Sequence, residues 1–176
     1  MYYQVLQAIK NTLEINLPEL KEVFIMGGGF GGIEDIQLKS INAPCIGIGI
    51  EGIPTNRRTN TNQLDSTLNF SLFLITSNHN KPNKDKEIEA YKLLEKLNLI
   101  IMNGHWLQGQ AIDSLLKEKI FKVYPTEQES ITCKNFYGPD LYKKDICLWE
   151  INWKQKVLLG KDRFEDGGFG NPEIEI

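Results

Sequence analysis

Two stretches that alternate with a period of two constrain the fold more than any other feature of this chain. In residues 67–76, TLNFSLFLIT, large apolar side chains occupy every second position: Leu68, Phe70, Leu72 and Leu74. In CIGIGI, residues 45–50, isoleucine takes every second position, and only Cys45, Gly47 and Gly49 lie between. Because successive side chains of a strand point to opposite faces, both stretches predict strands with one core face. The bare glycine face of the second strand is either a packing surface or a locally weak strand.

Two other segments carry apolar residues at helical spacing. Tyr2, Leu6, Ile9 and Leu13 share one face of a predicted opening helix that ends before Pro18. The segment 85–102 repeats the pattern and meets Asn103-Gly104, a typical helix stop. Its periodic residues are Ala90, Leu93, Leu94, Leu97 and Ile101.

The remaining apolar runs predict further strands. They lie at residues 23–26, 120–124, 131–136 and 142–159, the last with Cys147, Trp149, Ile151 and Trp153 on one face. Residues 54–66 hold almost nothing to bury, which predicts a long exposed loop or an extended hairpin tip. This order favours an α+β fold, a mostly antiparallel sheet with two main helices packed on one side. We expect one domain over residues 1–160 and a flexible, acidic, glycine-rich tail over residues 161–176 that could order on a partner.

Composition excludes several classes of protein. The chain has 176 residues, 41% of them hydrophobic, and a formal net charge of -3, so it is long enough for one core and has no general attraction for nucleic acid. Three cysteines at long spacings predict buried thiols rather than disulfides or a zinc site. The first residues lack the features of a signal peptide, and no stretch is apolar enough to span a membrane, which predicts synthesis and residence in a cytoplasm.

The run GGGFGG, residues 27–32, formally satisfies the dinucleotide-binding pattern GxGxxG at Gly27, Gly29 and Gly32, with Glu51 about twenty residues further on. That pattern needs a helix that begins at the glycines. Residues 33–44 alternate like a strand or loop and reach Pro44 too soon. We therefore favour a flexible or interface loop, and no cofactor, and keep a small nucleotide- or phosphate-binding enzyme as the alternative.

Other reactive residues form no catalytic or metal-binding pattern. The two histidines, His79 and His105, have no metal-ligand spacing, and the cysteines lie in predicted strands. The acidic pairs at 34–35 and 165–166 are typical of solvated charge. Arg57 and Arg58 suit either an interface or plain solubility. Trp149 and Trp153 are expected to be core anchors, whereas Trp106, in GHWLQG outside regular structure, is the better candidate for a contact surface.

The second half of the chain resembles small structural tail proteins of Mu-like phages and prophages, a family related in architecture to phage tail terminators. The resemblance rests on EAYKLLEKLNLIIMNGHWLQG, IFKVYPTEQESI and KKDICLWEINWKQKV. The opening helix, CIGIGI and LNFSLFLI agree with the same layout, so the likeness extends over roughly residues 1 to 160. It implies a tail-terminator-like fold and a subunit that assembles, commonly as a ring of six, where it caps the tail tube and joins it to the head.

The resemblance also implies partners and a location. The partners would be further copies of the chain, the tail tube and head-completion proteins, with no membrane and no sequence-specific nucleic acid, in a virion tail assembled in a bacterial cytoplasm. An adaptor protein encoded by a mobile element is a further alternative. Taken with the residues above, the candidate subunit-interface positions are Gly27, Gly29, Gly32, Gly47, Gly49, Arg57, Arg58, Trp106, Phe164 and Phe169.

Overall fold

The computed structural model describes residues 1–27, 30–60, 62–79, 85–104, 106 and 120–160. Gly29 and the predicted tail at 161–176, with Phe164 and Phe169, lie outside these residues.

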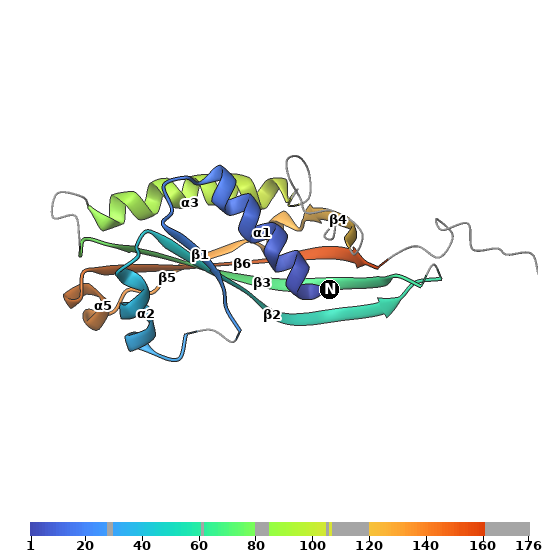
Figure 1. Ribbon diagram of the computed structural model, residues 1–176, viewed down its shortest axis with the longest axis horizontal. Helices are drawn as coiled ribbons and strands as arrows, with labels where there is room; N and C mark the ends of the chain where they lie inside the picture. Colours follow the sequence, from blue (N-terminus) through green and yellow to red (C-terminus); the bar gives the residue numbers. More distant parts are fainter. Residues whose placement is uncertain (28–29, 61, 80–84, 105, 107–119, 161–176) are drawn as a thin grey trace, which may run out of the picture.

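The described strands form one sheet with the order β1-β2-β3-β6-β4, in which β5 also pairs with β6 (Figure 1). All pairs are antiparallel except β1 with β2, which confirms the predicted α+β class with a mostly antiparallel sheet. The ladder between β3 and β6 runs without a break from Leu64 opposite Leu159 to Ser77 opposite Ile146. The strands are β1 (Glu22–Ile25), β2 (Cys45–Arg58), β3 (Leu64–Ser77), β4 (Ile120–Thr126), β5 (Thr132–Asn135) and β6 (Ile146–Leu159).

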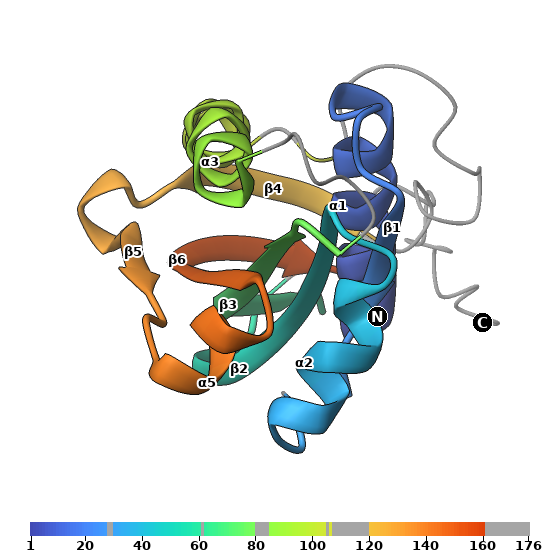
Figure 2. The same cartoon turned by 90° about the vertical axis from the view of Figure 1, so that its left-hand side faces the viewer.

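The two predicted helices are confirmed as α1 (Tyr2–Asn16) and α3 (Lys86–Asn103). Both cover the same face of the sheet, which we call the inner face (Figure 2). The Asp85 side chain caps α3 at its start, and Gly104 ends it at φ 58°, a left-handed conformation that favours glycine. The alternating residues of β3 pack against these helices with no exposed surface, as the period of two predicts: Leu68, Phe70, Leu72 and Leu74.

The opposite, outer face carries two further helices at one end of the molecule (Figure 2). They are α2 (Ile33–Ser40) and α5 (Pro139–Lys143), of which Ile36 and Leu141 pack against a small cluster on that face. One prediction is therefore wrong: residues 33–40, expected to be strand or loop, form the helix α2. The predicted packing of the two main helices on one side is confirmed by α1 and α3, and α2 and α5 are additional to it. The final strand also begins later than predicted, because α5 occupies part of its expected range.

Residues 54–66 form the extended hairpin tip that was one of the two predicted structures. Strands β2 and β3 continue to Arg58 and Leu64, and the turn between them is closed by Thr59 N–H donating to the Gln63 carbonyl at 2.8 Å. The Gln63 amide in turn donates to the Gly160 carbonyl at 3.2 Å, just beyond the end of β6. The tip is thus held to the rest of the sheet.

Between β4 and β5 the chain makes the short 3-10 helix η1 (Gln128–Ser130). Its Ser130 hydroxyl accepts a hydrogen bond from Lys154 N–H at 2.7 Å, so η1 and the two short strands lie along one edge of β6.

Candidate functional site

The glycine loop joins two parallel strands through a helix. Strands β1 and β2 pair in parallel from Glu22 opposite Cys45, and α2 begins directly after Gly32. This is the strand-helix-strand arrangement that a dinucleotide motif requires. The motif is disfavoured from the sequence because no helix is predicted after the glycines, and that reason does not hold.

The electrostatics of this helix start disfavour a phosphate for a different reason. The Asp35 carboxylate accepts a hydrogen bond from the Gly31 N–H at 2.8 Å, and Glu34 lies in the same first turn. An acidic side chain is itself stabilised by the positive end of a helix, and it already occupies an amide that an anion would need. An incoming phosphate would have to displace one carboxylate and approach a second.

Gly47 and Gly49 lie buried on the outer face, under side chains of the same chain. A Cβ added to Gly47 would meet the Met26 Sδ at 2.7 Å and the Phe24 Cε2 at 2.8 Å, and one added to Gly49 would touch Met26. The bare face of CIGIGI is thus a packing surface, and its occupants come from β1 and the residue after it. In the isolated chain neither glycine is open to a partner.

Trp106 is a core residue, and its prediction as part of a contact surface is wrong. Only 2% of it is exposed, and its ring centroid lies 5.8 Å from that of Trp153. Its indole N–H donates to the Gln155 side chain, whose amide donates to the carbonyls of Gly104 at 2.9 Å and Tyr124 at 2.7 Å. This buried network fixes the end of α3 to β4 and β6.

The two other tryptophans occupy the inner face, as predicted. Trp153 is 1% exposed and stacks on Phe70 with ring centroids 5.0 Å apart. Trp149 is half-buried and meets the exposed Tyr91 of α3 edge to face at 5.7 Å. The prediction of a core anchor is confirmed for Trp153, whereas Trp149 is only partly buried against the same cluster.

The sheet ends in two unlike strand edges. On one side β1 pairs only with Cys45–Ile48 of β2, and one further bond joins Met26 N–H to the Ile48 carbonyl. Beyond it, residues 51–58 pair with β3 alone within the part of the chain that the structure describes. On the other side β4 and β5 each pair with β6 alone among the described residues, and β5 is exposed at all four positions. Strand edges of this kind offer unpaired backbone groups to another chain.

Arg57 and Arg58 are exposed on the first of these edges, near the hairpin tip. Neither makes an ion pair with another described residue, whereas Asp65, opposite Arg57, is paired with Lys156 at 2.9 Å. Pro54 and two irregularities of register, between Ile50 and Thr55, interrupt the same strand. Because proline cannot donate and a bulge bends the strand, the part best able to accept a neighbour is the short stretch 55–58.

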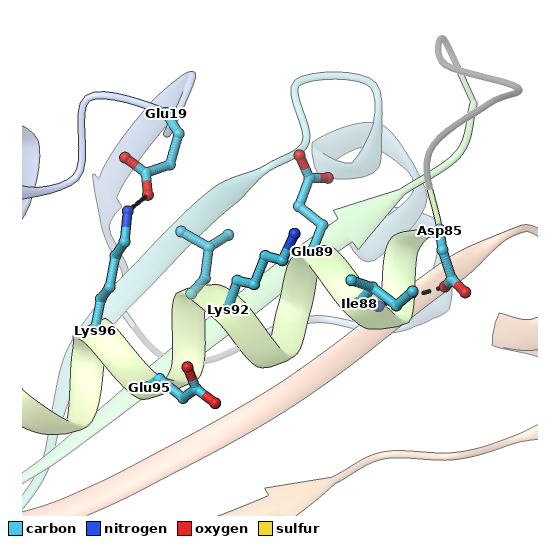
Figure 3. A pocket seen from close by; sticks show the side chains of 8 residues that line it. Glu19, Asp85, Ile88, Glu89, Lys92, Glu95 and Lys96 are labelled. Carbon is cyan, nitrogen blue, oxygen red and sulfur yellow. Dashed lines mark hydrogen bonds and ion pairs between the residues drawn. The ribbon is translucent and has the colours of Figure 1, made fainter.

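A groove of about 580 Å³ runs beside the first half of α3 and was not foreseen from the sequence (Figure 3). The Glu19 carboxylate lies across it from Lys96, to which it is hydrogen bonded, and that bond holds the pKa of Glu19 below its usual range. Leu93 supplies a buried apolar side chain and Ile88 a half-exposed one. The groove residues are Glu19, Asp85, Ile88, Glu89, Lys92, Leu93, Glu95 and Lys96.

The cysteines and histidines form no reactive pair or metal site that the structure can describe. Burial raises the pKa of Cys45 to about 12 and also raises that of Cys147, so both are thiols rather than thiolates near neutral pH. Cys133 is exposed, and His105 lies outside the described residues. Among described residues, no three His, Cys, Asp or Glu side chains are placed to hold a metal ion together.

No protein-family model matches the sequence, and no curated protein is significantly similar to it. None of the described helices combines the length and the apolar character needed to cross a membrane.

Proposed function

We propose that this chain is a structural subunit of a phage or prophage-derived tail, a terminator or completion protein that forms a ring, caps the tail tube and joins it to the head. The observation that carries the proposal is the pair of unlike free edges, residues 51–58 of β2 and Thr132–Asn135 of β5, on one sheet. The resemblance to tail proteins indicates the kind of particle to which the chain would belong. The edges offer backbone surfaces through which copies of the chain could assemble.

If two unlike edges of the sheet pair with each other between copies, the contact favours a ring or a filament over a two-fold dimer. When one surface of a subunit meets a different surface of the next, the contact repeats, and it generates a ring if the rotation closes and a filament if it does not. The unbroken pairing of β3 with β6 makes the body between the two edges rigid. A rigid body repeats the same rotation at every contact, which suits a ring of fixed size.

The edges also carry features that limit unwanted pairing. Pro54 and the irregular register interrupt the β2 edge, and β5 has only four residues. Short, interrupted edges resist open-ended aggregation. Assembly through them would therefore depend on further side-chain contacts, which gives it specificity.

Light scattering and negative-stain images of the purified chain, alone and with tail tubes, test the proposal. We expect discrete rings or ring-sized particles, and cosedimentation with tubes. A protein that stays monomeric at high concentration and never joins tubes would refute the proposal. Stabilisation by a nucleotide in a thermal-shift assay would instead favour the alternative that uses residues 27–32.

Proline substitutions on the β2 edge sharpen this test. Backbone N–H groups point alternately to the two sides of a strand. Of Asn56→Pro and Arg57→Pro, one therefore removes a donor from the free edge and the other removes a donor to β3. We expect the first kind to reduce association with little change in the melting temperature, and the second to lower the melting temperature clearly.

A further inference from the structure

The groove beside α3 carries an excess of negative charge. Its lining has four carboxylates, Glu19, Asp85, Glu89 and Glu95, against the two ammonium groups of Lys92 and Lys96. The Lys96 ammonium group is already bound by Glu19, and Asp85 accepts the N–H of Glu87 at 2.9 Å as the helix cap. Glu95 is exposed and makes no ion pair within the described residues.

The groove is also partly apolar, which matters for the kind of cation it suits. Leu93 is 1% exposed at its base and Ile88 is 53% exposed at its side. An arginine side chain fits such a surface, because its aliphatic stem covers apolar atoms while its planar guanidinium binds carboxylates in two places. A small inorganic cation would gain nothing from the apolar part.

The hairpin tip has the complementary charge and a defined shape. Residues 55–63 contain Arg57 and Arg58 and no acidic residue. Both arginines are exposed, and the turn beside them is closed by bonds between Thr59 and Gln63, including Gln63 N–H to the Thr59 hydroxyl at 3.0 Å. Because these bonds already hold the two strand ends together, the arginines beside them lose less conformational entropy when they dock.

Tip and groove lie toward opposite ends of the long axis of one molecule. In Figure 1 the turn between β2 and β3 is at the right-hand end, whereas α3 begins at the left. A contact between them therefore joins two copies, and it again brings together two different surfaces, as a ring requires.

We propose that the groove beside α3 receives the Arg57–Arg58 hairpin tip of a second copy of this chain. The inference rests on the proposed function, since it names the side-chain contact that accompanies subunit assembly. The guanidinium groups meet the carboxylates of Glu89 and Glu95, and the arginine stems cover Ile88.

Charge reversal and its rescue test this contact. Arg57→Glu with Arg58→Glu, and separately Glu89→Lys with Glu95→Lys, should each weaken self-association at least tenfold, because like charges then face each other. A mixture of the two double variants should associate to within a few-fold of the original chain, because the tip of one then matches the groove of the other. Lys143→Glu, at an exposed position of α5 outside both strand edges and the groove, is the control for a change of net charge.

The outcomes separate the contact from the proposed function. Rings that form equally well in both double variants would overturn the tip-groove contact and leave the ring proposal standing. Loss of association with no rescue in the mixture would also overturn the contact. A chain that never self-associates would overturn both. Circular dichroism of each variant, together with the milder pair Arg57→Gln and Arg58→Gln, shows whether a loss comes from misfolding.

Discussion

The two faces of the sheet differ in their side chains and in how far helices cover them. Along β3 and β6 the inner-face positions hold no charged residue, and α1 and α3 pack against this face. The outer face is covered by α2 and α5 only at one end, where four phenylalanines meet in a chain from Phe24 through Phe30 and Phe73 to Phe136. Beyond that cluster, four successive outer-face positions of β6 are polar before Leu158: Glu150, Asn152, Lys154 and Lys156.

This difference separates what holds the fold from what is left for partners. Burial of apolar surface is the largest favourable contribution to folding, and most of it lies on the inner face. The exposed side chains of the polar half of the outer face, of the strand edges and of the groove take little part in this burial. They can therefore vary or be mutated with the fold intact, which is what an assembly surface needs.

The largest effect should follow from an inner-face substitution. Trp153→Ala removes a ring that is 1% exposed and stacked on Phe70, and we expect the free energy of unfolding to fall by about 3–5 kcal/mol. Lys154→Ala, on the next residue and the outer face, should change it by less than about 0.5 kcal/mol. Urea unfolding measures both changes, and far-ultraviolet circular dichroism is the signal because it does not depend on the tryptophan that is removed. Similar losses for the two variants would contradict the distinction between the faces.

A smaller loss of folding stability is expected from a substitution at a hydrogen-bonded polar group on the inner face. Trp106→Phe keeps most of the ring but removes the N–H that Gln155 accepts, which leaves a buried amide oxygen without that donor. The free energy of unfolding should fall by about 1–3 kcal/mol, the usual cost of an unsatisfied buried group.

The double substitution Trp106→Phe with Gln155→Leu checks the cause of this loss. Because it removes both partners, it should recover part of the loss if the unsatisfied oxygen is the cause. Its own cost lies in the bonds that Gln155 donates to Gly104 and Tyr124. Gln155→Leu alone is the reference, because it loses the same two bonds. Trp106→Phe should lower the free energy of unfolding less in that background than in the original chain, and an equal loss in urea unfolding would contradict the explanation.

The inner face was largely predictable from the sequence, and the outer face was not. In β3 every second residue is buried, and in α1 and α3 every third or fourth residue is buried. These regular spacings of apolar residues are strong signals of a strand and of helices. In α2 only Ser40 is buried and Leu38 is 67% exposed, so no stripe of period 3.6 marks it.

The candidate surfaces depend on contacts between distant residues, which local patterns cannot show. The sequence places Trp106 at a surface because its partner Gln155 is 49 positions away and leaves no local trace. The groove joins Glu19 to Lys96, 77 positions apart. By contrast, the exposure of Arg57 and Arg58 follows from their own polar neighbourhood and was expected.

The smallest effect tests whether buried polar groups on the outer face behave like those on the inner face. Ser71 is 2% exposed, yet its hydroxyl has no hydrogen-bond partner within the described residues, and the same holds for the side-chain oxygen of Asn152 opposite it. Ser71→Ala removes an unpaired group rather than a hydrogen bond. The free energy of unfolding should therefore change by less than about 0.5 kcal/mol or rise slightly.

Ser66→Ala, at a fully buried position on the inner face where the hydroxyl donates to Asn56 at 3.0 Å, is the matched control and should cost about 1 kcal/mol. Equal losses in urea unfolding would mean that Ser71 makes a bond that matters, and that the outer face at this point is part of the structural core.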